Sequence, residues 1–378
     1  MKQISLFIYI FIQVLLLSAC GGGSKTSSAS IEGDTIALRY ADNLSLTEYK
    51  DYTIAKLRNP WDTIHTLHTY ILVDKDKQIP ADLPEGTLVR TPLSKVVVYS
   101  SVHCSLINQL GAFSSIGGVC DLQYIKLPEV QEGCFNGSIV DAGNGMNPDI
   151  EKIIDMHPDG ILLSPFENSG GYGRIEKLKV PIIECADYME TSALGRAEWM
   201  RFYGLLFGKT QQADALFAEV EKEYNALKEQ VAVLSFAPSV ISELKNGSAW
   251  YIPGGKSTSA RLYADAGANY VFANDEHSGS VPLAFETVFD KGENADFWLI
   301  KYNQATDKTY KELQKDYAPY AGFRAFKEKN IYACNTNNVP LYEEFPFHPE
   351  WLLKDLIKIF HPSLLEDHQL RYFTKLAD

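Results

Sequence analysis

The stretch KVVVYS at residues 95–100 decides the fold class of this 378-residue chain. No polar residue alternates with the apolar residues at its centre, and such a run is typical of a strand that is buried on both faces of a sheet. Further apolar strands follow helix-like segments, in DGILLSP at 159–165 and VPIIECAD at 180–187. Because strands that alternate with helices form parallel sheets, this region is predicted to be an α/β lobe.

The same alternation returns in the second half of the chain. SVISEL at 239–244, ADFWLIKYN at 295–303 and IYACNT at 331–336 are predicted strands, with helical patterns between them. The order of elements agrees with that of the first half. We therefore predict two similar α/β lobes with mostly parallel sheets, at residues 34–192 and 232–378.

The two lobes are expected to be joined by helices at residues 193–231. Apolar residues recur there at helical spacing between Ala213 and Leu227, and Gly208 precedes them. This pattern predicts a shorter helix followed by a long linking helix over 210–230, which would span ~30 Å and act as a stiff hinge. Residues up to about 94 carry strand and turn signals instead, which indicates a β-rich extension of the first lobe.

The first twenty residues have the composition of an export signal. Lys2 precedes an apolar run from Ile4 to Leu17, and the run closes as LLLSAC at Cys20. This ending is typical of a bacterial lipobox, so we predict a signal peptide at 1–19 and lipid attachment to Cys20. A transmembrane anchor is disfavoured because the run is shorter than the ~20 residues that a span needs.

The Gly/Ser-rich residues 20–33 are expected to form a flexible tether to the membrane. The protein is therefore predicted to be a membrane-anchored lipoprotein that faces the bacterial periplasm. Cysteines can oxidise in that compartment, and we expect a disulfide between Cys120 and Cys134. The formal net charge of −13, from 35 Lys+Arg and 48 Asp+Glu, argues against a nucleic-acid partner.

Candidate ligand contacts lie after the predicted strands, because ligands of open α/β sheets bind beyond the carboxyl ends of the strands. The set mixes aromatic and amide side chains with few charges, which suits a bulky polar ligand with apolar faces. No HExxH, CxxC or GxSxG motif occurs, so we expect no catalysis and no cofactor. The candidates are Ser101, His103, Asn144, Met146, Phe166, Tyr188, Trp250, Tyr251, Lys256, Asn303 and Asn335.

Two other functions are compatible with the pattern. His103, His348 and Asp187 could together bind zinc or manganese across the cleft, which would make the chain a metal-ion-binding protein of the same bilobal type. A surface α/β hydrolase is a third interpretation, and the absence of a nucleophile motif disfavours it.

Five stretches carry a resemblance to a known family: KVVVYSS, IGGVCD, GNGMNPDIEKIIDMHPDGILL, LKVPIIECAD and VPLAFETVFDKGENADFWLI. Together they extend over roughly 95–378, and they resemble the substrate-binding lipoproteins and periplasmic proteins of ABC importers for iron chelates, heme and cobalamin. The resemblance implies a monomer whose two lobes move little when they capture a siderophore-type iron chelate, cobalamin or heme. It also implies delivery to an ABC transporter permease with its ATPase subunits.

The resemblance extends to single residues. The motif GMN-x-x-E-K-I is close to that of cobalamin binders in the family. This chain departs from it by one extra residue, because Pro148-Asp149-Ile150 stands before Glu151. The family docks on its permease through one glutamate on each lobe, and those positions match Glu151 and Glu286. Both follow a proline in the first turn of a predicted helix, where an acid would also favour the helix dipole by ~0.3–1 kcal/mol.

Overall fold

The computed structural model describes residues 33–378, except residue 63 and residues 168–170. The predicted signal peptide, Cys20 and almost all of the tether lie outside this part of the chain, so they stay predictions. Within the described ranges, no helix is long and apolar enough to span a membrane.

The first predicted lobe contains a five-stranded parallel sheet in the order β12-β11-β6-β7-β8. Its central strand β6 is buried at every position, as the apolar stretch predicted. Helix α2 begins where the Ser100 hydroxyl accepts from the Val102 N–H, and α4 begins where Asp149 accepts from the Lys152 N–H. The elements of this lobe are β6 Val96–Val98, α2 Ser101–Gln109, β7 Ile116–Val119, α3 Pro128–Asn136, β8 Val140–Asp141, β9 Gly143–Asn144, β10 Asn147–Pro148, α4 Ile150–Met156, β11 Gly160–Leu163 and β12 Ile182–Glu184.

The second lobe is built on a sheet in the order β16-β13-β18-β19-β20, in which only β20 is antiparallel. A smaller antiparallel sheet has the order β14-β15-β17. The prediction of two α/β lobes with mostly parallel sheets is confirmed. The strands are β13 Ser239–Ser242, β14 Lys245–Asn246, β15 Ala249–Pro253, β16 Asn269–Tyr270, β17 Ser280–Leu283, β18 Phe297–Tyr302, β19 Ile331–Asn335 and β20 Thr374–Lys375.

The helices of the second lobe are α8 Thr258–Asp265, α9 Phe285–Gly292, α10 Tyr310–Asp316, α11 Arg324–Lys327, α12 Leu341–Glu344 and α13 Pro349–Phe360. Among them, α8, α9 and α11 contact strands of these sheets. Single-turn 3-10 helices lie at Phe113–Ser115, Leu122–Tyr124, Ile175–Leu178, Asp187–Met189 and Ala318–Gly322.

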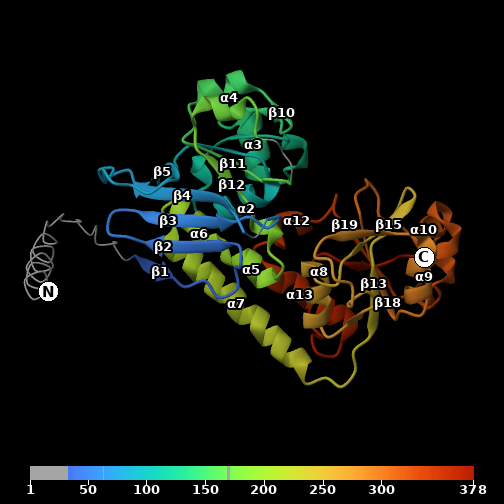
Figure 1. Ribbon diagram of the computed structural model, residues 1–378. Coiled ribbons are helices and arrows are strands. Elements are labelled where there is room, and N and C mark those ends of the chain that lie inside the picture. Colours follow the sequence, from blue (N-terminus) through green and yellow to red (C-terminus); the bar gives the residue numbers. More distant parts are fainter. Residues whose placement is uncertain (1–32, 63, 168–170) are drawn as a thin grey trace, which may run out of the picture. The chain divides into compact units, whose positions relative to one another are not determined.

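Three helices join the lobes: α5 Ala193–Glu198, α6 Met200–Leu206 and α7 Thr210–Ala232. Helix α7 has 23 residues and is therefore ~35 Å long, which confirms the predicted long linking helix. Its buried stripe includes Phe217, Val220 and Leu227. It packs against α6 and against α13 (Figure 1). Asp34–Asp378 forms one compact unit, so the lobe boundaries at 192 and 232 stay predictions.

The β-rich extension is a five-stranded sheet in the chain order β1-β2-β3-β4-β5, antiparallel except for the last pair. The Tyr70 hydroxyl donates to the Ile182 carbonyl at 3.0 Å and accepts from the Glu184 N–H at 2.8 Å, so the sheet is bonded to the edge strand β12. The Tyr70 ring also lies 5.9 Å from that of Phe202 on α6. The strands are β1 Asp34–Ile36, β2 Leu44–Glu48, β3 Thr53–Arg58, β4 Thr66–Asp74 and β5 Thr87–Thr91.

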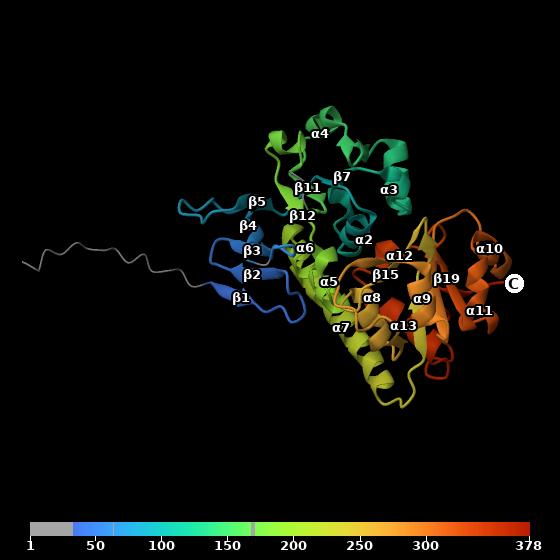
Figure 2. The same ribbon diagram turned by 45° about the vertical axis from the view of Figure 1, so that its right-hand side comes forward.

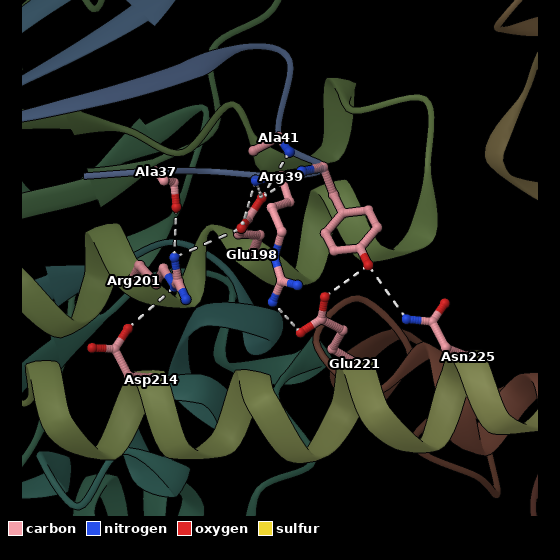
Figure 3. Close-up of polar contacts among 9 residues, drawn as sticks. Ala37, Arg39, Ala41, Glu198, Arg201, Asp214, Glu221 and Asn225 are labelled. Atoms are coloured by element: carbon pink, nitrogen blue, oxygen red, sulfur yellow. Dashed lines mark hydrogen bonds and ion pairs between the residues drawn. The ribbon is translucent and has the colours of Figure 1, made fainter. Parts of the chain in front are cut away.

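Residues 39–43, which connect β1 to β2, bind to buried glutamates on or next to the linking helices, and we call this contact the extension joint. Figure 3 shows the part of it around Glu198 and Glu221. Glu198 is fully buried on α5 and accepts the backbone N–H groups of residues 39, 40 and 41 at 2.8–3.0 Å. Glu190 accepts those of residues 42 and 43 at 3.1 and 2.9 Å. On α7, Glu221 bonds the Arg39 guanidinium and the Tyr40 hydroxyl. The extension is thereby fixed to the helices that join the lobes.

The predicted disulfide between Cys120 and Cys134 is not formed, and both residues are free thiols. The reason is their packing. Cys120 follows β7 and belongs to a small buried cluster with Val97 and Ile161, whereas Cys134 lies on α3 and packs against the larger core. Proximity in sequence therefore did not bring the two sulfur atoms together.

Candidate ligand cleft between the lobes

The carboxyl ends of both parallel sheets line one cavity of about 430 Å³, which we call the cleft. The first lobe contributes Ser101, which follows β6, and two residues that follow β7. The second lobe contributes residues at the ends of β13, β18 and β19, and α12 lies beside α2 (Figure 2). The lining consists of Ser101, Tyr124, Lys126, Glu243, Lys301, Tyr302, Asn303, Thr336, Tyr342 and Glu343.

An ion pair between Lys301 and Glu243 dominates the electrostatics of the cleft. The Lys301 Nζ lies 2.5 Å from the Glu243 Oε1, and the two side chains are only 24% and 22% exposed. Burial by itself would lower the pKa of Lys301, but the Glu243 carboxylate outweighs that effect and holds the pKa above its ordinary value. Lys301 is therefore protonated at neutral pH.

Glu243 is held in an unusual backbone conformation. Its φ of 68° lies in the left-handed region, which side chains other than glycine and asparagine rarely adopt. The Glu243 N–H donates to the Leu299 carbonyl at 2.9 Å, and the Glu243 carbonyl accepts from the Trp298 Nε1 at 2.9 Å. These two bonds fix the direction in which the carboxylate enters the cleft.

The remaining lining residues offer aromatic and acidic groups. Tyr124 and Tyr342 are 67% and 53% exposed, so their rings are open to a ligand. Burial raises the pKa of Glu343, which means that its charged form is only partly compensated by Lys126 and Ser101. A ligand that supplies hydrogen-bond donors would relieve this cost.

A second cavity of about 510 Å³ lies at the same edge of the first lobe. The two cavities are lined by consecutive residues, since Ser100 lines the second cavity and Ser101 lines the cleft. Only one lobe lines it, so the smaller cleft is the better candidate for a site that uses both sheets. Its lining includes Tyr99, Ser100, Asp121, Met146, Pro148, Leu163, Phe166, Tyr172 and Arg174.

Four of the residues predicted from the sequence line these cavities. Ser101 and Asn303 line the cleft from opposite lobes. Met146 and Phe166 line the second cavity, and Met146 is 82% exposed. Strand ends in a parallel sheet meet at one edge, which explains why these four residues lie at the cavities. Their role as ligand contacts stays a prediction.

Three predicted ligand contacts have buried side chains and line neither cavity. Trp250 is fully buried, donates from Nε1 to the Ser242 carbonyl at 3.1 Å and packs beside Trp298. Alternation along β15 turns Tyr251 outward and Trp250 inward. Asn335 is also buried, and its amide donates to the Gln304 carbonyl at 2.9 Å. His103, the third, belongs to a buried network.

His103 and Asp187 form the centre of that network. The His103 Nε2 lies 2.9 Å from the Asp187 Oδ1, and the Tyr203 hydroxyl bonds both groups. Burial alone would lower the pKa of His103, but Cys185 and Asp187 raise it to about 10. Burial alone would raise the pKa of Asp187, but His103 and Arg196 lower it to about 2. Both groups are therefore charged at neutral pH.

The predicted zinc or manganese site is not assembled. His348 bonds the Glu350 carboxylate and the Gln109 amide oxygen, each at 2.8 Å, instead of joining His103. Within the part of the chain that the structure describes, no cluster of three or more His, Cys, Asp or Glu side chains could hold a metal ion.

Four predicted residues lie outside both cavities. The Asn144 amide donates to Asp121 at 3.1 Å, and the Tyr188 hydroxyl donates to the Pro165 carbonyl at 2.6 Å. Lys256 pairs with Glu276, and Tyr251 is 49% exposed on β15 without lining either cavity.

Sequence reasoning missed most of the charged and aromatic residues of the cleft. Glu243 and Lys301 stand at the ends of two predicted strands, so strand position was a usable signal for them. Tyr342 and Glu343 come from the short helix α12, and only the packing of α12 against α2 brings them to the cleft.

Comparison with known proteins places this geometry in a family. The model of the family described as periplasmic binding protein matches residues 96–337, which include both parallel sheets and the linking helices. The chain belongs to the periplasmic binding protein family. Proteins of this family bind solutes outside the cytoplasm, and this membership argues against a hydrolase.

This periplasmic binding protein is also similar to individual proteins over most of its length. An uncharacterised lipoprotein of Methanocaldococcus jannaschii is 25% identical over 365 residues, which cover 90% of this chain and 86% of that protein. A possible iron-binding periplasmic solute-binding protein from Staphylococcus epidermidis has a TM-score of 0.56 at 18% identity, covering 71% of this chain and 99% of that one. A periplasmic heme-binding protein from Roseiflexus sp. RS-1 has a TM-score of 0.56 at 20% identity, with the same coverage. These solved structures share the fold.

Proposed function

We propose that this periplasmic binding protein captures a siderophore-type iron chelate, cobalamin or heme in the cleft and delivers it to an ABC transporter permease. The observation that carries the proposal is a cavity lined by the carboxyl ends of both parallel sheets. Tyr124, Tyr302 and Tyr342 offer aromatic faces there, which suit a large planar or amide-rich ligand. The structural relatives from Staphylococcus epidermidis and Roseiflexus, named for iron and heme, support this class of ligand.

Titration of the soluble form that lacks residues 1–20 tests the proposal. Heme, cyanocobalamin and ferric chelates absorb visible light, so binding can be followed by absorbance together with tryptophan fluorescence. Saturable binding of at least one of these ligands is expected. Binding of none of them, alongside binding of zinc or manganese, would favour the metal-ion alternative.

The protein is proposed to be held at the membrane by lipid on Cys20, with residues 20–33 as the tether. Metabolic labelling with a fatty acid should mark the wild-type chain and leave Cys20→Ala unmarked. Label on the variant would contradict this anchor.

Glu151 and Glu286 are the proposed contacts with the permease. Both are exposed and lie in the first turns of α4 and α9, and neither forms an ion pair with any residue between 33 and 378 that the structure describes. Asp149 already caps α4, so Glu151 is not needed for that role. Free carboxylates on both lobes could bind arginines on the two halves of a permease by charge-assisted, bidentate bonds.

Charge reversal separates docking from ligand capture. The double variant Glu151→Arg/Glu286→Arg should keep ligand affinity and abolish uptake in cells that carry the matching permease, because attraction becomes repulsion at two points. A control with the same charge change is Glu129→Arg/Glu229→Arg, at two exposed acids on α3 and α7. Normal transport by the first double variant would leave the helix dipole as the role of both glutamates.

A further inference from the structure

We infer that the ligand of the cleft is close to electrically neutral, such as a ferric trihydroxamate or a corrinoid with amide side chains, and is not a polyanion such as a ferric tris-catecholate. This inference rests on the proposed function and narrows its ligand class. It follows from the charges that line the cleft, from the way in which they are fixed, and from the second cavity.

The formal charges that line the cleft cancel. Two cations and two anions face it, with three tyrosines and three small polar side chains between them. A site built for a polyanion would need an excess of cations, because each uncompensated charge brought into a partly buried site loses hydration. The charged residues are Lys126, Lys301, Glu243 and Glu343.

The central cation is not available to an incoming anion. The ammonium of Lys301 is already paired with Glu243 at 2.5 Å. The left-handed backbone of Glu243, anchored by Leu299 and Trp298, keeps the carboxylate beside it. An anionic ligand at Lys301 would therefore either break the pair or lie against a carboxylate of like charge.

The second cavity repeats this arrangement independently. Its charged lining residues are Asp121 and Arg174, which again cancel. Asp121 follows β7 as Glu243 follows β13, and its φ of 53° also lies in the left-handed region. A backbone conformation of this kind is unfavourable for residues other than glycine, and it is typical of functional sites. Both lobes thus direct a fixed carboxylate to the edge where the ligand is expected.

The net charge of the whole chain also disfavours a polyanionic ligand. The whole chain carries a formal net charge of −13, which slows the approach of a polyanion. A neutral ligand avoids this repulsion. Its carbonyl and hydroxamate oxygens can accept from the remaining donors of Lys301 and Asn303 without separating the ion pair.

A competition titration of the full-length protein in detergent tests the inference. The probes are a neutral ferric trihydroxamate, cyanocobalamin, heme and a ferric tris-catecholate of charge −3. At least one of the two neutral probes should bind about 100-fold more tightly than the tris-catecholate, or about 2.7 kcal/mol. Preference for the tris-catecholate or for heme would overturn the inference and leave the proposed function intact. Binding of no probe would overturn both.

Charge variants of the cleft sharpen the test. Glu243→Gln gives the lining a charge of +1 and should shift the tris-catecholate/neutral affinity ratio about tenfold toward the anion, whereas Lys301→Met should shift it the opposite way. Glu343→Gln makes the same charge change as Glu243→Gln without touching the strained backbone, so it replaces that variant if the latter does not fold. Glu276→Gln, outside both cavities, should leave the ratio unchanged. An unchanged ratio in all three cleft variants would contradict the inference.

Discussion

The extension joint and the cleft are both built around glutamates, but they use them differently. In the extension joint, Glu198 and Glu190 are buried, and five backbone N–H groups donate to their oxygens. In the cleft, Glu243 meets one lysine, and Glu343 is only partly compensated. A buried carboxylate whose acceptors are all occupied holds the fold together, whereas one with free acceptors at the carboxyl edge of a sheet can bind a ligand.

The first and largest expected effect concerns Glu198. Glu198→Ala should reduce the free energy of unfolding by about 3–5 kcal/mol, because three partly buried backbone N–H groups lose their fully buried acceptor. Urea unfolding followed by circular dichroism measures this change. Glu343→Ala is the matched control in the cleft, and it should stay within about 0.5 kcal/mol of the wild type. Equal losses in the two variants would remove the distinction between the two regions.

The second prediction concerns the buried network of His103 and Asp187 and the dependence of its stability on pH. The pKa of His103 is raised from its ordinary value of 6.5 to about 10, so its contribution to stability is complete below pH 6.5 and is lost as pH rises toward 10. The pKa of Asp187 is lowered to about 2, so its contribution is present above pH 3.8 and is lost as pH falls toward 2. The alkaline change is the easier one to isolate.

Between pH 7 and 9, the wild type should lose up to about 1.4 kcal/mol of unfolding free energy per pH unit relative to His103→Gln. Urea titrations of both proteins across this range give the difference directly. Tyr203, Cys185 and Arg196 face the same pair and are retained in the variant, so they contribute to both curves. Parallel curves would mean that His103 is not held protonated.

The third and smallest expected effect lies in the cleft. Tyr342→Ala should weaken binding of whichever probe saturates the cleft by about tenfold, or 1.4 kcal/mol, because it removes an open aromatic face. Its free energy of unfolding should not change, since the ring is 53% exposed. Trp250→Ala provides the contrast, because loss of this fully buried ring should destabilise the fold by about 3–5 kcal/mol. Unchanged affinity of Tyr342→Ala would exclude this ring from the ligand site.

The strand signals explain why the region of the site could be predicted and its composition could not. Apolar runs such as residues 95–100 fix strand positions, and strand ends in a parallel sheet share one edge, so Ser101 and Asn303 were found. Whether a side chain near a strand end faces ligand or core depends on one step of alternation and on the neighbouring elements. Trp250 and Tyr251 differ in just this way.

The two α/β lobes and the long helix α7 could be predicted from the sequence, because hydrophobic periodicity is a local property of the chain. Which charges meet depends on how the elements pack. Glu198 finds the backbone of residues 39–41, and Lys301 finds Glu243, through contacts between residues 58–159 positions apart. The tertiary structure also keeps Cys120 and Cys134 apart by packing them into different clusters. Such pairings follow from how sheets and helices pack, and no local pattern encodes them.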